Sequence, residues 1–257
     1  MFVSELYAPT AGADSTVDDP SILERVPGGT IRDAEYLLTK STFKYSPDEL
    51  VEMAKNALRK GVGVEDPDIL SDDMIFQAPV VGPISKTEYL DALENFDLLT
   101  AFPDMDSRTY MIQADPFEEG RVWWFTRTVA TYVSFFFFFL SLSLFSLAEL
   151  LRALRFFFFR FAAQTGPLLG KEATGKRLEL PPQANSFVFN TDGKIEVVTV
   201  GYVLDRRCGN TGGLGGAFAF FYGVGRPLPI PECQPFKPSF RFRMLGLVGK
   251  LRKKLSK

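Results

Sequence analysis

The sequence predicts an α+β fold in which helices pack on one face of a curved antiparallel sheet. Two amphipathic helix patterns, at 46–60 and 86–96, come before a run of strand patterns that extends from 107 to 203. Helices first and an antiparallel meander afterwards favour this arrangement, because one face of such a sheet must be covered. A third observation complicates the prediction: a phenylalanine-rich hydrophobic stretch, at about 133–164, interrupts the strands.

The first helix has clear start signals. Ser46-Pro47-Asp48-Glu49 supplies an N-cap residue, a proline at the first helical position and early acids. The helix is expected to run to about Lys60, with one apolar face formed by Leu50, Met53, Ala54, Ala57 and Leu58. A second amphipathic helix is expected from Lys86 to Phe96, after a short strand and a proline-stopped loop.

Strands are expected at 107–114, 121–131, around 178–180, 185–190 and 194–203. Thr191-Asp192-Gly193 is a hairpin turn between the last two, since Asp-Gly tolerates positive φ. Trp123 and Trp124 are neighbours on one strand, so one of them faces the core and the other faces away.

The hydrophobic stretch is a poor membrane span. Val133 to Ala148 is uncharged but shorter than the roughly 20 residues that a bilayer requires. Glu149, Arg152, Arg155 and Arg160 then interrupt it, and each such charge costs about 2.5–3.5 kcal/mol at a helix centre. A genuine insertion and a membrane element remain alternatives.

The interpretation that we favour is a translated intron, residues 133–164, retained in the coding sequence. Val133-Ser134 is what an intron donor such as GTGAGT encodes, and runs of Phe, Leu and Ser are what pyrimidine-rich DNA encodes. Gln164 fits the CAG of an acceptor. Without this stretch, the strands join through the polar connection ATYTGPLLGKEATGK. A translated intron implies a eukaryotic gene.

Composition excludes several classes of function. The net charge of −2 gives no preference for nucleic acid, and Cys208 and Cys233 lack the spacing of a zinc site. With no histidine in the chain, acid–base chemistry falls to carboxylates, tyrosines or lysines. We therefore expect no metal and no cofactor.

The two ends differ in charge. Residues 1–40 are expected to form an acidic, largely disordered leader without a recognisable signal or transit peptide, which leaves the cytoplasm and a plastid open. Residues 208–257 combine a glycine-rich helix with a basic tail that could contact an anionic membrane surface. A solvated tail is the simpler interpretation.

Several short motifs, in order, resemble the SnoaL-like polyketide cyclase family of the nuclear transport factor 2-like superfamily. They are DDMIFQAPVVGP, EYLDAL, FPD, VWWFTR, TG-PLLG-ATGK, FN-DGKI and YVLD, over about 46–132 and 165–205. The family's THxG corresponds to Thr131-Tyr132-Thr165-Gly166, and only when 133–164 is removed. The resemblance implies a cone-shaped domain formed by 41–132 and 165–207.

The resemblance also implies a site inside the cone. Asp205, at the end of the last strand, is the expected general acid/base, with a pKa raised by burial. Asp104 of FPD is a second catalytic candidate. The simpler alternatives are a surface ion pair of Asp205 with Arg206 or Arg207, and a turn or cap role for Asp104.

Five further residues are expected to line the pocket: Phe76, Trp124, Arg127, Tyr132 and Tyr202. Core packing, or a surface ion pair for Arg127, is the simpler role for each. Tyr132 replaces the family's histidine, which puts cyclase activity in doubt.

Two functions follow from the resemblance. The first is a cofactor-free cyclase, isomerase or dehydratase that acts on a small apolar or polyketide-like molecule. The second is a ligand-binding or scaffold module without chemistry, for which a homodimer is an option. A membrane-associated protein, attached through 133–160 and the basic tail, is the third hypothesis.

Overall fold

The computed structural model describes residues 19–95, 98–132, 174–235, 237, 239–240 and 243–245. The hydrophobic stretch 133–164, the first part of the expected leader and the basic residues after 245 lie outside the described residues. The helices are α1 (Ala34–Leu38), α2 (Pro47–Arg59), α3 (Lys86–Asn95), α4 (Leu98–Ala101) and α7 (Gly216–Gly223), with 3-10 turns at Pro67–Ile69 and Pro231–Cys233. None of the helices described here has the length and apolar content that a bilayer span requires.

A six-stranded sheet forms the centre of the fold, with the strand order β4-β3-β10-β9-β6-β5. Its strands are β3 (Leu70–Gln77), β4 (Ile84–Ser85), β5 (Tyr110–Ala114), β6 (Arg121–Thr126), β9 (Gln183–Phe189) and β10 (Ile195–Val203). All neighbours are antiparallel except β3 and β10, which run parallel. The predicted α+β class with a curved antiparallel sheet is confirmed, with the parallel β3–β10 pair as the one difference among the described strands.

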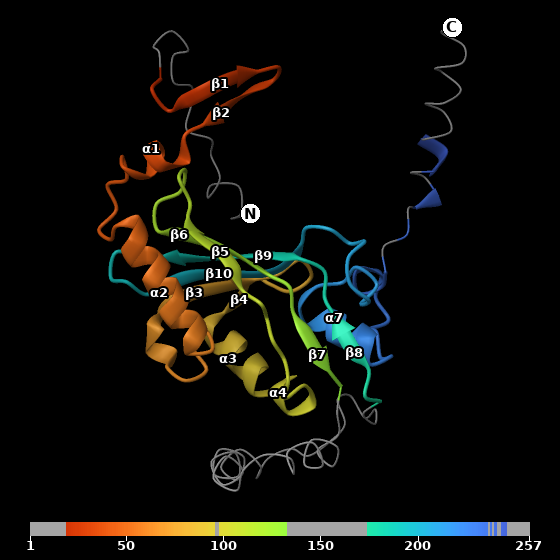
Figure 1. Ribbon diagram of the computed structural model, residues 1–257. Coiled ribbons are helices and arrows are strands. Elements are labelled where there is room, and N and C mark those ends of the chain that lie inside the picture. The colour runs from red at the N-terminus through yellow and green to blue at the C-terminus, as the bar shows by residue number, and fades with distance from the viewer. Residues whose placement is uncertain are drawn as a thin grey trace, which may run out of the picture.

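The sheet bends sharply beyond β6 and β9. The chain continues from β6 into β7 (Val129–Thr131) and enters β9 from β8 (Arg177–Glu179), and β7 and β8 pair as a second ladder. Between the ladders lie Pro181 and Pro182, which have no N–H to donate, and the amide of Leu180 bonds the carbonyl of Thr128 at 2.9 Å. Figure 1 shows β7 and β8 turned away from the sheet, toward α4 and α7.

The first helix of the body follows its sequence signals. The Ser46 hydroxyl accepts a hydrogen bond from the backbone N–H of Glu49, and the Glu49 carboxylate accepts one from the N–H of Ser46, which completes a capping box. Helix α2 contacts β5 and β6, and α3 contacts β3 and β4 (Figure 1). Both helices therefore cover the same face of the sheet.

Two apolar clusters hold the fold together. The first joins α2 and α3 to the sheet and has as buried members Leu50, Ala54, Ala57, Leu70, Met74, Tyr89, Val122, Trp124, Phe187, Phe189, Ile195 and Val198. The second joins α4 and α7 to the bent ladder and has as buried members Ala101, Phe102, Ala130, Tyr132, Leu178, Leu180, Leu214, Ala219, Phe220 and Val224. The helix expected in the glycine-rich region is thus α7, packed at the bend.

Part of the expected disordered leader is folded. Residues 22–32 form a hairpin of β1 (Ile22–Val26) and β2 (Gly29–Arg32), which α1 connects to the body. Asp33 caps α1 by accepting the N–H of Tyr36, and Arg32 pairs with Asp19. These local bonds order 19–40 despite its polar composition. Figure 1 shows the hairpin projecting from the body.

The described residues on the two sides of 133–173 are paired with each other. The N–H of Tyr132 donates to the carbonyl of Lys176 at 3.0 Å, and the N–H of Gly175 donates to the carbonyl of Tyr132 at 2.8 Å. These bonds extend the β7–β8 ladder by one more pair. Tyr132 and Gly175, one on each side of 133–173, are therefore hydrogen-bonded neighbours in the same hairpin.

Candidate functional site

The structure places Asp205 in a partly exposed turn just after β10. Its carboxylate accepts hydrogen bonds from the backbone N–H of Arg207 at 3.0 Å and from the Arg207 guanidinium at 3.0 and 2.9 Å. These hydrogen bonds hold the pKa of Asp205 well below its ordinary value. Asp205, the expected general acid/base, thus has a lowered pKa, whereas burial would have raised it.

Asp104 lies in the exposed loop after α4 and contacts the bent ladder. Its Oδ1 accepts the backbone N–H of Thr131 at 2.6 Å. This bond ties the loop to the outer edge of β7. The geometry matches the structural role that the sequence left open for Asp104, and the carboxylate lies next to Tyr132, one of the expected pocket residues.

The expected pocket-lining residues divide into three groups. Phe76 stacks on Tyr89 with ring centroids 5.0 Å apart, and Trp124 packs on Phe187 at 4.2 Å, so both belong to the first cluster. Tyr132 is 2% exposed and lies in the second cluster. The other two, Arg127 and Tyr202, are exposed.

A polar side chain that the sequence analysis did not select lies between the two clusters. Asn185 occupies the helix-covered face of β9, because it alternates with the core residues Phe187 and Phe189. It is opposite a bulge in β10, where the register shifts between Thr199 and Tyr202. The N–H of Gly201 at this bulge donates to Asn185 Oδ1 at 3.0 Å.

The amide nitrogen of Asn185 is held less tightly than its oxygen. Nδ2 lies 3.3 Å from the Thr126 hydroxyl and 3.4 Å from the carbonyl of Gln183, which is longer than the usual 2.9–3.0 Å. The Gln183 Oε1 accepts the N–H of Gly216 at the start of α7, at 2.8 Å. We call these three residues, Thr126, Gln183 and Asn185, the polar band. It crosses an otherwise apolar face.

The opposite face of the sheet carries a separate network around Arg121, which is 7% exposed. Its guanidinium donates to both oxygens of Glu118 at 2.6 and 2.8 Å and to the Ser186 hydroxyl at 2.6 Å. The guanidinium also lies 5.2 Å from the Trp123 ring. Trp123 and Trp124 thus face opposite sides of β6, as predicted, and the Arg121 charge is neutralised within the fold.

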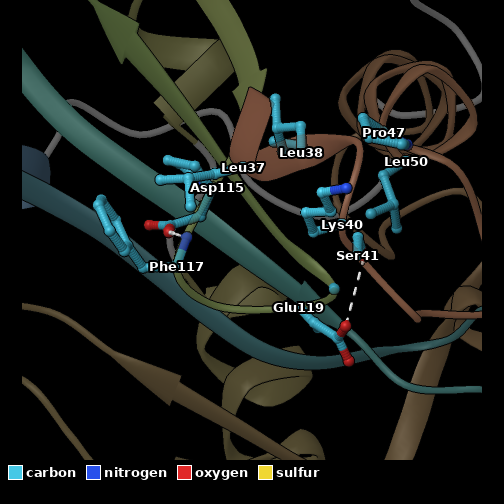
Figure 2. A pocket seen from close by; sticks show the side chains of 12 residues that line it. Leu37, Leu38, Lys40, Ser41, Pro47, Leu50, Asp115, Phe117 and Glu119 are labelled. Carbon is cyan, nitrogen blue, oxygen red and sulfur yellow. Dashed lines mark hydrogen bonds between the residues drawn. The ribbon is translucent and has the colours of Figure 1, made fainter. Parts of the chain in front are cut away.

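A cavity of about 240 Å³ lies between α1, the start of α2 and the β5–β6 turn (Figure 2). We call it the outer pocket. Its lining residues are Leu37, Leu38, Lys40, Ser41, Pro47, Leu50, Ala114, Asp115, Pro116, Phe117, Glu119 and Gly120. Among the described residues, no group of three or more acidic, cysteine or histidine side chains is placed to hold a metal ion.

Comparison with solved structures gives neighbours of low identity. A Jannaschia sp. CCS1 protein assigned as a SnoaL-like polyketide cyclase is 13% identical with a TM-score of 0.43, covering 73% of this chain and 97% of that chain. AclR of Streptomyces galilaeus, assigned as a hydroxylase, is 16% identical with a TM-score of 0.37, over 87% and 94% of the two chains. An epoxide hydrolase of M. tuberculosis is 12% identical with a TM-score of 0.34, over 71% and 93%.

No protein-family model matches the sequence, and no curated protein is significantly similar to it. At these identities and TM-scores, the neighbours say nothing about the substrate or reaction of this chain, which have to be argued from its own residues. Two further neighbours carry polyketide cyclase or NTF2 in their names: a Xanthomonas campestris protein that is 16% identical with a TM-score of 0.37, and a protein named Rd1NTF2_04 that is 9% identical with a TM-score of 0.32.

Proposed function

We propose that this domain binds a small, largely apolar molecule against the helix-covered face of the sheet, at the polar band. The observation that carries the proposal is the Asn185 amide. Its oxygen is fixed by the β10 bulge, while both contacts of its nitrogen are long. A buried N–H with weak partners is costly to keep, unless a better acceptor completes it.

The chemistry of the band suits a carbonyl compound. Asn185 Nδ2 has two N–H donors, and a ligand carbonyl can accept one of them at a shorter distance than the Thr126 hydroxyl does. The aromatic rings of Trp124 and Phe187 lie along the same face and would contact the apolar part of the ligand. A small aromatic or polyketide-like ketone combines both features.

We propose that the domain binds its ligand without converting it, because neither Asp205 nor Asp104 is placed to act as a general acid. Asp205 is held by Arg207 with a lowered pKa, and Asp104 accepts a backbone N–H in an exposed loop. A general acid near neutral pH needs a raised pKa. A cyclase or isomerase step at Asp205 would first require the pair with Arg207 to open.

The test is a titration with the neutral fluorescent naphthyl ketone prodan. We expect saturable binding by the intact chain. Thr126→Val removes the hydroxyl without changing the shape of the side chain, and Asn185→Asp keeps the oxygen that meets Gly201 but loses the N–H donors. Loss of one hydrogen bond of about 1 kcal/mol weakens binding about fivefold; we expect this for Asn185→Asp.

The matched control is Val188→Ala on the same strand. Val188 alternates with Phe187 and Phe189, so it faces away from the band. It should leave the affinity for prodan unchanged. Absence of saturable binding, or equal affinities for Asn185→Asp and Val188→Ala, would refute the proposal. Asp205→Asn should not change binding, and a prodan affinity that depends on it would move the site to the end of β10.

A further inference from the structure

The outer pocket contains one cation whose charge no carboxylate neutralises. Lys40 Nζ lies 5.0 Å from the centroid of the Tyr36 ring, and in the described part of the chain no carboxylate lies within ion-pair distance of it. Figure 2 shows the ammonium beside Leu50 and Pro47, pointing away from the Glu119 carboxylate. An aromatic face attracts a cation but does not use its N–H donors.

The two carboxylates of the outer pocket are already bonded to neutral donors. Asp115 accepts the N–H groups of Phe117 and Glu118 at 2.7 and 3.0 Å and the indole N–H of Trp123 at 2.5 Å. Glu119 Oε1 accepts the N–H and hydroxyl of Thr42 at 2.6 and 2.9 Å. These bonds hold Asp115 and the Oε1 atom of Glu119 in the surrounding loops, both carboxylates keep their negative charges, and Lys40 is the one cation among the lining residues.

The remaining wall is apolar. Leu37 and Leu38 come from α1, Pro47 and Leu50 from α2, and Phe117, which is 74% exposed, stands at the rim. A cavity of about 240 Å³ is smaller than the roughly 300–1,000 Å³ of drug-sized sites. It therefore suits a short hydrocarbon chain or a single aromatic ring with one charged end.

We propose that the outer pocket is a binding site for a small amphipathic anion, a medium-chain or aromatic carboxylic acid. The carboxylate accepts hydrogen bonds from Lys40, and the hydrocarbon part packs on Leu38, Pro47 and Leu50. A bond between ammonium and carboxylate is about twice as strong as one between neutral groups. This site is separate from the polar band and does not rest on the function proposed there.

The experiment compares three eight-carbon probes by isothermal titration of the full chain: octanoate, octanol and octylammonium. Each has eight carbons in a straight chain, and the head groups are negative, neutral and positive. We expect octanoate to bind most tightly and its affinity to fall as salt is added, because the ion pair is partly exposed. Tighter binding of octylammonium, or no octanoate binding at all, would overturn the proposal.

Two lysine variants locate the charge. Lys40→Ala should weaken octanoate binding at least fivefold and leave octanol binding nearly unchanged. Lys44→Ala is the matched control, because Lys44 lies nearby but donates to the carbonyl of Thr191 at 2.9 Å, outside the pocket. Equal losses in the two variants would refute the assignment. Thr126→Val should not affect octanoate, and Lys40→Ala should not affect prodan, so the two sites can fail independently.

Discussion

Deletion of residues 133–164 tests the organisation of the chain most directly. The backbone bonds of Tyr132 with Gly175 and Lys176 close the β7–β8 hairpin on either side of the stretch. The segment outside the described residues runs from 133 to 173, which is 41 residues, and the deletion leaves 41 − 32 = 9 of them. Nine residues easily connect two adjacent strand ends, so we expect the shortened chain to fold.

The magnitude follows from loop closure. The entropic cost of closing a loop grows as (3/2)RT ln n, so shortening it from 41 to 9 residues stabilises the fold by about 1.3 kcal/mol. For a chain of 257 − 32 = 225 residues, each kcal/mol shifts Tm by about 2–4 °C. The deletion should therefore raise Tm by about 3–5 °C, if 133–164 makes no stabilising contact with the domain.

Thermal unfolding followed by circular dichroism measures this shift. The control is a chain in which 133–164 is replaced by 32 residues of glycine and serine, which restores the loop length and should restore the original Tm. A shortened chain that is insoluble, or that melts below the full-length protein, would refute the reasoning and show that the stretch belongs to the fold. Transcripts read across Tyr132 and Thr165 test the intron hypothesis separately.

Three further predictions concern buried and tethering side chains. Trp124→Ala should lower the free energy of unfolding in urea by about 3–5 kcal/mol, because the indole is 3% exposed in the first cluster; a loss below 1 kcal/mol would contradict that packing. Tyr89→Phe should lower the free energy of unfolding by about 1 kcal/mol, because it removes the hydrogen bond from the Tyr89 hydroxyl to the Val62 carbonyl. Burial raises the pKa of Tyr89, so wild-type stability should fall above pH about 10, and the variant should lose this decline. Hydrogen bonds from Thr42 lower the pKa of Glu119 from its usual 4.5, so the ionised Glu119 stabilises the fold above that pH and this stabilisation is lost as the pH falls. In urea denaturation series between pH 3 and 6, the free energy of unfolding of Glu119→Gln should therefore depend less on pH than that of the wild type.

Local signals in the sequence predicted the elements that depend on local bonds. The capping residues of α2 and its apolar spacing define a helix that the structure gives as Pro47–Arg59, within a residue of the expected ends. The Asp192-Gly193 turn likewise joins β9 and β10. Their determinants lie within a few residues of one another, which is the range that sequence patterns report.

Pairings between distant segments left no such signal. Strand β3 lies parallel to β10, more than 100 residues later in the chain, although the sequence predicted an antiparallel meander. A short edge strand, β4, pairs with β3 alone and was expected to be a loop. The β1–β2 hairpin has a turn signal in the sequence, Pro27-Gly28, but the acidic composition around it favours disorder, and the structure shows that the turn signal is the better guide there.

The candidate site shows the same division. Asp205 and Arg207 form an ion pair and are only two positions apart in the sequence, and this pair was among the alternatives that the sequence offered. Asn185 could have been found from its place in the alternation with Phe187 and Phe189, since a polar residue on an apolar face needs a partner. Its partner, however, is the bulge at Gly201, and the sequence does not show which strand that bulge faces.

Two breaks in the strand ladders lie near the polar band. Pro181 and Pro182 separate the β6–β9 ladder from the β7–β8 ladder, and the Gly201 bulge interrupts the ladder between β9 and β10. The bulge leaves the N–H of Gly201 without a ladder partner, and the side-chain oxygen of Asn185 accepts it, while the side-chain oxygen of Gln183 accepts the N–H of Gly216 at the start of α7. Strand alternation places Asn185 on the covered face, and the bulge holds its oxygen so that its amide nitrogen meets Thr126. The ligand site that we propose at this position uses these groups and needs no contribution from Asp205.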